Sequence, residues 1–287
     1  KGSVVLGSLR VRQDVIIFEG LMGADKVGKG GPNDPVEASL ARIRQLGAHE
    51  VGHALGLVHN FAGSTQGRTS VMDYPGPQID LVDGAPDLTN AYAVGIGSWD
   101  KFTVDWLYGQ PAPGVDPDAA AAAKAQAIVA SGMRFITDID GRAPETPNPW
   151  GSMWDNGPDP TVELARMMGV RRAAIERFGL GMLREGEPVS NLRRKFVPIW
   201  LLHRYQIDAT AKMVGGVDYF YAVKGDPRPA PTPVAAATQR AALAGLLATL
   251  SPAELEVPDR LAQLLSSGVN GRNDVQSDIE VLANAGS

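Results

Sequence analysis

Three of the four histidines in this 287-residue chain lie within eleven consecutive residues, from His49 to His59. The stretch reads H-E-V-G-H-A-L-G-L-V-H, so His49 and His53 are four positions apart. On a helix this spacing puts both imidazoles on one face, where a single metal ion can contact both. Gly56 can adopt a left-handed conformation and end the helix, after which the returning chain can supply His59 as a third ligand. Three protein ligands with one open position are typical of a catalytic zinc site, whereas a structural site is closed by four.

Glu50 follows the first of these histidines and is expected to point beside the metal rather than at it. Bound zinc lowers the pKa of its water to about 7, which yields a nucleophile at neutral pH. Glu50 would act as the general base that takes a proton from this water and passes it to the leaving amine. The alternative role for Glu50 is a solvated carboxylate on a helix. For the short H-E-x-x-H motif alone, the alternative is a surface helix that binds no metal.

The extended motif, followed by a methionine turn, is the signature of the metzincin zinc peptidases. A candidate Met-turn follows at residues 70–75, with the sequence S-V-M-D-Y-P, so the chain resembles this family in both motifs. Residues 91–109 look like the last helix of such a domain. The chain is also similar to a family of large bacterial zinc-dependent metalloproteases, which have a metzincin-type catalytic domain followed by a helical C-terminal region. That similarity lies in four short segments, 58–61, 70–74, 95–100 and 202–206.

The resemblance implies roles for three further residues. Met72 would form an apolar floor under the histidines without binding the metal; the alternative is an ordinary buried methionine. Tyr74 would reach the metal or donate to the developing oxyanion, unless it is only a packed turn aromatic. Asp100 would tie the last helix to the Met-turn backbone, unless it is a charge favoured by the helix dipole. The resemblance also implies an extracellular or periplasmic location, although the chain shows no signal peptide.

Composition limits the classes of partner. The formal net charge is −5, with 44% hydrophobic and 21% charged residues, which is typical of a globular protein. No basic stripe suggests a nucleic-acid binder, and no run of about eighteen apolar residues predicts a membrane span. The absence of cysteine excludes a disulfide scaffold and a thiolate zinc site. The expected partner is a peptide or protein substrate, with Zn²⁺ as the cofactor.

The helix that must carry the histidines has a clear start. Asp34 is a good N-cap, Pro35 suits the first helical position and Glu37 completes a capping-box pattern, which predicts a helix over 35–55. Another helix opens near Ser98. Further helices are expected over 117–131, 160–178, 189–213, 233–249, 252–265 and 274–285. Strands are expected only over 3–11 and 133–137, and residues 75–90 are expected to form a long surface loop.

The predicted fold class is therefore mainly α (α+β). Residues 1–110 would form the C-terminal half of a metzincin catalytic domain, with its active-site helix and Met-turn, and residues 111–287 a helical region. Only 48 residues precede His49, too few for the usual N-terminal sheet, so we expect an upstream part of the same polypeptide to complete the domain. The predicted function is that of a zinc-dependent endopeptidase. The alternatives are a catalytically incomplete metal-binding fragment that serves as a binding or scaffold module, and a helical region that is a separate interaction module.

Four other features leave alternatives open. His203, in an apolar helical stretch, is either a satisfied core residue or a further ligand. Residues 138–141, D-I-D-G, form either a turn or the start of a calcium loop that lacks its later ligands. Residues 215–221 either line a groove or pack at a helix-to-loop junction. The proline-rich stretch 226–233 is either a linker or a stiff surface crossing.

Overall fold

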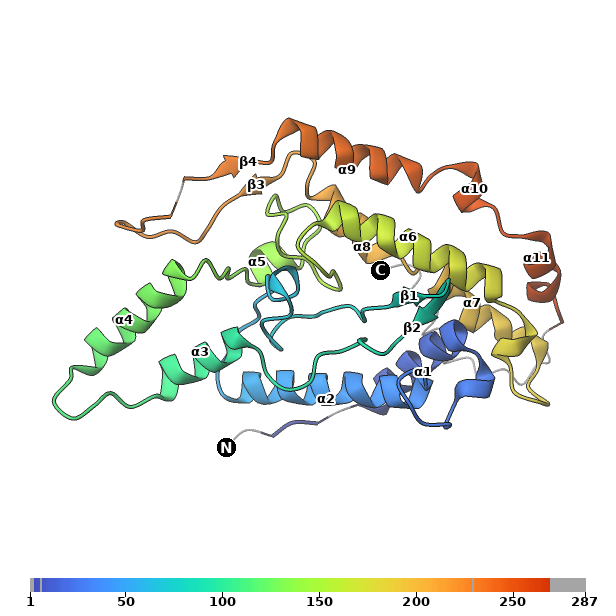
Figure 1. Cartoon of the computed structure of the whole chain (residues 1–287), viewed down its shortest axis with the longest axis horizontal. Helices are drawn as coiled ribbons and strands as arrows, with labels where there is room; N and C mark the ends of the chain where they lie inside the picture. Colours follow the sequence, from blue (N-terminus) through green and yellow to red (C-terminus); the bar gives the residue numbers. More distant parts are fainter. Residues whose placement is uncertain (1–2, 6, 229, 269–287) are drawn as a thin grey trace.

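The computed structural model describes residues 3–5, 7–228 and 230–268, and helices dominate it (Figure 1). The α-helices are α1 (Ser8–Met22), α2 (Pro35–Ala54), α3 (Ser98–Tyr108), α4 (Pro117–Ala130), α5 (Asp138–Gly141), α6 (Pro160–Arg177), α7 (Leu192–Trp200), α8 (Arg204–Ala211), α9 (Ala236–Ala248), α10 (Pro252–Leu255) and α11 (Asp259–Leu265). Short 3₁₀ turns are η1 (Ala24–Lys26), η2 (Ser64–Gln66), η3 (Leu180–Met182) and η4 (Val189–Asn191).

Strands contribute little to the described part of the chain. β1 (Asp80–Val82) and β2 (Ala85–Asp87) form an antiparallel hairpin in which Leu81 lies opposite Pro86. β3 (Val217–Asp218) pairs in the same manner with β4 (Thr232–Pro233). The fold class is thus mainly α, as predicted. The expected loop over 75–90 contains the β1–β2 hairpin.

The helices form two long sides of the molecule. α2 runs along one side, α9 to α11 follow one another along the other, and the β1–β2 hairpin lies between α2 and α6 (Figure 1). The main core lies where α1, α6 and α7 meet, and its fully buried side chains include Phe18, Val170 and Ile199. A second, smaller apolar cluster of Leu57, Val71 and Met72 lies beside the histidine motif. No helix of the described residues is both long and apolar enough to cross a membrane.

Helix α2 starts at Pro35 with Asp34 as its N-cap, as predicted. The Asp34 carboxylate accepts a hydrogen bond from the backbone of Val36 at 2.9 Å, which satisfies a free N–H of the first turn. The same carboxylate accepts from the backbone of Gly28 at 3.0 Å and Gly30 at 2.7 Å. One side chain therefore fixes both the beginning of α2 and the glycine-rich loop that leads into it.

The end of α2 is a Schellman turn centred on Gly56, whose φ is +90°. The Leu57 N–H donates to the Gly52 carbonyl at 3.0 Å, and the Gly56 N–H donates to the His53 carbonyl at 2.9 Å. A residue with a side chain is strained at this φ, so the glycine has a conformational role. The turn reverses the chain and brings His59 back toward the face of the helix that carries His49 and His53.

The prediction of a strand over residues 3–11 is wrong. Residues 8–11 belong to α1, and residues 3–5 and 7 are irregular. The β-branched residues Val4, Val5 and Val11 favour a strand locally. The later turns of α1 bury Phe18 and Leu21 in the main core, and this tertiary packing outweighs the local preference.

Three other predicted elements differ. Residues 133–137 form no strand; their backbone bonds instead to the loop after His59, where the Phe61 N–H donates to the Ile136 carbonyl at 2.7 Å. The helix expected over 189–213 is divided into η4, α7 and α8, and that expected over 252–265 into α10 and α11. The helix predicted over 274–285 lies outside the described residues.

Candidate metal centre

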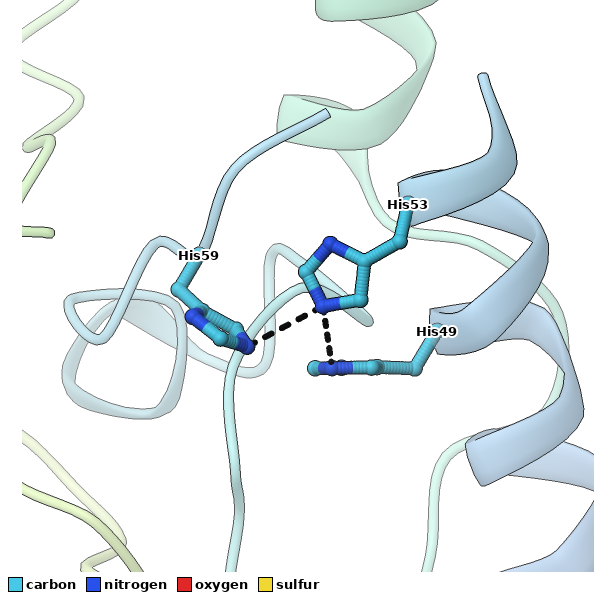
Figure 2. A group of neighbouring side chains, drawn as sticks. All are labelled: His49, His53 and His59. Carbon is cyan, nitrogen blue, oxygen red and sulfur yellow. Dashed lines mark hydrogen bonds between the residues drawn. The ribbon is translucent and has the colours of Figure 1, made fainter. Parts of the chain in front are cut away.

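Three imidazoles converge at the end of α2. His49 and His53 project from adjacent turns of this helix, and His59 faces them from the loop after the Gly56 turn (Figure 2). The Nε2 atom of His53 lies 3.1 Å from the Nε2 of His49 and 3.1 Å from the Nε2 of His59. One nitrogen from each of the three rings lies within 4.8 Å of the others. Ligands about 2.0–2.1 Å from a tetrahedral zinc ion stand roughly 3.3 Å apart, so the spacing fits such an ion.

The opposite nitrogen of each ring faces an oxygen atom. His49 Nδ1 is 2.7 Å from the Val71 carbonyl, and His53 Nδ1 is 2.9 Å from the Leu57 carbonyl. His59 Nδ1 lies 2.9 Å from Oδ2 and 3.0 Å from Oδ1 of Asp138. Such oxygens only accept hydrogen bonds, so each Nδ1 carries the proton. Each Nε2 of a neutral ring then presents its lone pair to the other two.

This arrangement has a direct chemical consequence. Three lone pairs directed at one another repel unless a cation lies between them, and neutral imidazole is the form that binds metal. Burial lowers the pKa of His49 to about 4, since its side chain is removed from water. The donor set therefore fits a divalent metal ion such as zinc.

Met72 packs against α2 at Gly52, next to His53 in the sequence. Its side chain is 1% exposed, and a Cβ atom added at Gly52 would lie 2.2 Å from the Met72 sulfur. Gly52 lies on α2 between His49 and His53. The absence of a side chain at residue 52 thus lets the methionine approach the helix between the two histidines.

Asp100 joins the start of α3 to the segment that contains Met72. Its carboxylate is buried and accepts from the Ser70 hydroxyl at 2.6 Å and the Val71 N–H at 2.8 Å. It also accepts from the Gly97 N–H at 2.7 Å, at the beginning of the helix. The side chain therefore makes both the tie to the methionine segment and a contact at the N-terminus of α3.

Tyr74 lies against the histidines. Its ring centroid is 4.8 Å from that of His49 and 4.9 Å from that of His59. On its other side, the ring of Trp154 lies 5.6 Å away, and the Trp154 N–H donates to the Tyr74 carbonyl at 2.7 Å. The phenol is thus held in ring contact with two of the three imidazoles.

Glu50 is half-buried on α2, next to His49. Its negative charge acts on His49 in the direction that raises the histidine's pKa, although burial has the larger and opposite effect. Within the described residues, its carboxylate has no hydrogen-bond partner. It is therefore an available proton acceptor beside the three-histidine group.

Asp138 and Arg142 belong to the site, and sequence analysis did not assign them to it. Asp138 is the first residue of α5 and bonds to His59, although the two are 79 residues apart. The Arg142 Nε donates to Asp138, and the guanidinium lies 5.3 Å from the centroid of the Tyr74 ring. Partial burial alone would raise the pKa of Asp138, but hydrogen bonds from Arg142 and His59 hold it below its usual range. Residues 138–141 are therefore a short helix next to the histidines.

Two buried carboxyl groups hold Ser64, in the segment that follows His59. The Ser64 N–H donates to Asp73 at 2.6 Å, and the Ser64 hydroxyl donates to Asp155 at 2.7 Å. Burial raises the pKa of Asp155 to about 7, and burial together with the charge of Asp155 raises the pKa of Asp73 well above its usual value. Ser64 thus links Asp73, which follows Met72, to Asp155, which follows Trp154.

The other sequence candidates lie elsewhere. Among the described residues, the one group of potential metal ligands consists of His49, His53 and His59, and His203 does not belong to it. The hydroxyls of Tyr219 and Tyr221 both donate to Asp140, the latter at 2.7 Å, so residues 215–221 include a packed junction. In the stretch 226–233, the last two residues pair with β3 as strand β4.

A helix that carries two imidazoles, a glycine turn that returns a third and a buried methionine packed against that helix form a three-histidine group that could hold a metal ion, on a mainly helical fold. A model of the Met-zincin family matches residues 31–285, and the chain belongs to this family. Membership implies a zinc metallopeptidase. Comparison with curated proteins and with solved structures found no match.

Proposed function

We propose that this protein is a zinc-dependent endopeptidase in which His49, His53 and His59 hold the metal and Glu50 is the general base. One observation carries the proposal. In each histidine, Nδ1 donates a hydrogen bond to an oxygen atom, and Nε2 points toward the Nε2 atoms of the other two rings. This is the arrangement of a preorganised set of metal ligands. Three protein ligands leave a position open for water or substrate.

When bound, zinc supplies Lewis acidity that polarises the peptide carbonyl and makes water a stronger acid. The chain's own residues supply the remainder. The Glu50 carboxylate takes a proton from the attacking water and delivers it to the amine that leaves when the peptide bond breaks. The Tyr74 hydroxyl donates a hydrogen bond to the carbonyl oxygen as negative charge develops there.

Met72 and Asp100 have supporting roles in this proposal. Residues 70–75 act as the Met-turn, in which Met72 forms an apolar floor that restricts the movement of the imidazoles. Asp100 accepts hydrogen bonds from the Ser70 hydroxyl and the Val71 N–H, and the Val71 carbonyl in turn accepts a hydrogen bond from His49 Nδ1. The proposal includes an extracellular or periplasmic location, which rests on the family resemblance alone.

The test compares the unaltered chain with His53→Ala and Glu50→Gln. Elemental analysis of the unaltered protein should give one zinc per chain, and His53→Ala should lose it. Glu50→Gln should keep the zinc, while turnover of an unstructured protein substrate falls by about 10²–10⁴-fold, the usual contribution of general acid–base catalysis.

Each part of the proposal can fail separately. Equal zinc in the unaltered chain and in His53→Ala would contradict the ligand assignment. Loss of zinc from a folded Glu50→Gln variant would make Glu50 a ligand rather than the base. A chain that holds zinc but hydrolyses no peptide would instead be a metal-binding module.

A further inference from the structure

The third histidine, His59, differs from the other two in the hydrogen-bond partner of its Nδ1. Backbone carbonyls accept hydrogen bonds from Nδ1 of His49 and of His53, and one of these carbonyls, that of Leu57, lies in the turn that ends α2. His59 instead bonds to the carboxylate of Asp138, a side chain that belongs to α5. The orientation of the third imidazole therefore depends on a distant segment of the chain.

That segment is fixed against the loop that carries His59. The Phe61 N–H donates to the Ile136 carbonyl at 2.7 Å, and the Ile136 N–H donates to the side-chain oxygen of Asn60 at 3.1 Å. The Asn60 amide also donates to the Arg134 carbonyl at 3.0 Å. These bonds hold the beginning of α5 next to His59 without any help from the Asp138 side chain.

The carboxylate is in turn held from its other side. Arg142, one turn further along, donates its Nε to Oδ1 of Asp138. The His59 side chain is 10% exposed, whereas that of Asp138 is 44% exposed. The ion pair thus lies at the surface, and its inner end contacts a buried imidazole.

We propose that Asp138 is a positioning residue that fixes the proton of His59 on Nδ1 and aims its Nε2 at the metal, with Arg142 holding the carboxylate in place. This inference rests on the proposed function, because it assumes that the three histidines bind zinc. A carboxylate acceptor also increases the basicity of a ligating imidazole, and loss of such a partner typically weakens metal binding by about 10- to 100-fold.

The competing interpretation is a simple surface ion pair. An exposed Asp–Arg pair contributes little to stability and would have no effect on the metal. The two interpretations differ in what the removal of the carboxylate changes. A positioning residue alters zinc affinity, whereas a surface ion pair alters at most the stability of the metal-free protein.

The experiment measures the zinc dissociation constant by competition with a chromophoric chelator, together with the Tm of each metal-free protein. The variants are Asp138→Ala, Asp138→Asn and Arg142→Leu. Glu145→Gln is the matched control, because it removes one negative charge from an exposed residue of the following loop that does not contact a histidine.

We expect Asp138→Ala to weaken zinc binding by about 10- to 100-fold. Asp138→Asn should have a smaller effect, because the amide oxygen can still accept a hydrogen bond from Nδ1 although the negative charge of the carboxylate is lost. Arg142→Leu should have an effect no larger than that of Asp138→Ala, and Glu145→Gln should bind zinc like the unaltered chain. The Tm of the metal-free proteins should be similar.

A second readout follows the histidine itself. In ¹⁵N-labelled, metal-free protein, the His59 ring nitrogens should show the proton on Nδ1, and this pattern should be lost or mixed in Asp138→Ala. Equal zinc affinities in all variants, with an unchanged His59 pattern, would overturn the inference and leave the zinc site intact. Failure of the unaltered chain to bind zinc would overturn both this inference and the proposed function.

Discussion

Tyr74 contacts two of the three imidazole rings, and one substitution can distinguish a catalytic role of its hydroxyl from a packing role of its ring. Its centroid lies 4.8 Å from His49 and 4.9 Å from His59, so removal of only the hydroxyl should leave this ring packing intact. If the hydroxyl donates to the developing oxyanion, its contribution arises mainly in the transition state.

We therefore predict that Tyr74→Phe lowers kcat by roughly 10- to 10³-fold and leaves KM nearly unchanged. Steady-state kinetics of the zinc-loaded variant provide the measurement, with zinc content determined on the same sample. An unaltered kcat would return Tyr74 to the role of a packed aromatic in the turn.

The histidines, Glu50, Met72, Tyr74 and Asp100 were all predicted from the sequence, the histidines and Glu50 from the local motif and the other three from the family resemblance. Asp138 and Arg142 were not. Their i, i+4 spacing is common to any helical ion pair, and the partner of Asp138 lies 79 residues earlier in the chain. Only the folded backbone brings His59 and Asp138 together, so no local spacing could reveal the contact.

At the scale of the element, α2 contains two glycines with opposite surroundings. A Cβ atom at Gly52 would lie 2.2 Å from the Met72 sulfur, whereas a Cβ atom at Gly47 would meet nothing within 4 Å. Both positions are helical, so both would gain the same reduction in unfolded-state entropy from alanine. The pair therefore isolates the effect of packing against Met72.

We predict that Gly47→Ala stabilises the protein by about 0.5–1 kcal/mol. Gly52→Ala should destabilise it by about 1–3 kcal/mol, the usual cost of overpacking, and should also weaken zinc binding because Met72 must move. Urea unfolding and chelator competition measure the two effects. Equal stability of the two variants would show that Met72 moves aside without cost.

The elements also show which boundaries local sequence can define. The start of α2 was predictable, because a cap and a proline at N1 act within one turn. The interruption between α7 and α8 was not. The Trp200 carbonyl accepts from the Arg171 side chain at 2.7 Å, and the Arg204 N–H donates to Leu201 instead. Arg171 belongs to α6, so the bond that ends α7 is a tertiary contact.

At the scale of the whole molecule, the site draws on segments far apart in the chain. Residues 49–74 supply the histidines, the methionine and the tyrosine, and α5 supplies Asp138. The division of the chain at residue 110 stays a prediction, and the site contains residues from both sides of it. A sequence pattern can predict that helices follow the motif, but not which of them packs against it.

His203 connects folding stability to pH, because its ring is partly buried next to Arg171, Glu254 and Arg204. Burial, followed by the charge of Arg171, lowers its pKa to about 4, whereas an unfolded histidine titrates near about 6.5. Between these values the unfolded chain binds a proton that the folded chain does not. This group therefore makes the free energy of unfolding decrease as the pH falls from about 6.5 toward 4, with no effect above that range.

We predict that His203→Gln flattens this part of the pH profile while it leaves the fold at pH 7.5 intact. Urea unfolding of both proteins between pH 7.5 and 4.5, with a chelator present to remove the contribution of zinc, measures the difference. Parallel profiles would mean that the His203 ring is protonated equally in both states.

The two backbone groups of Val71 bond to different parts of the site, the N–H to Asp100 and the carbonyl to His49. Its N–H donates to Asp100 at 2.8 Å, and its carbonyl accepts from His49 Nδ1 at 2.7 Å. For hydrogen exchange, this makes the Val71 amide an internal reporter, because the opening that exposes it also loosens the carbonyl that orients the buried histidine. Occupancy of the metal site should therefore slow deuterium uptake at this amide more than at those along the exposed face of α3.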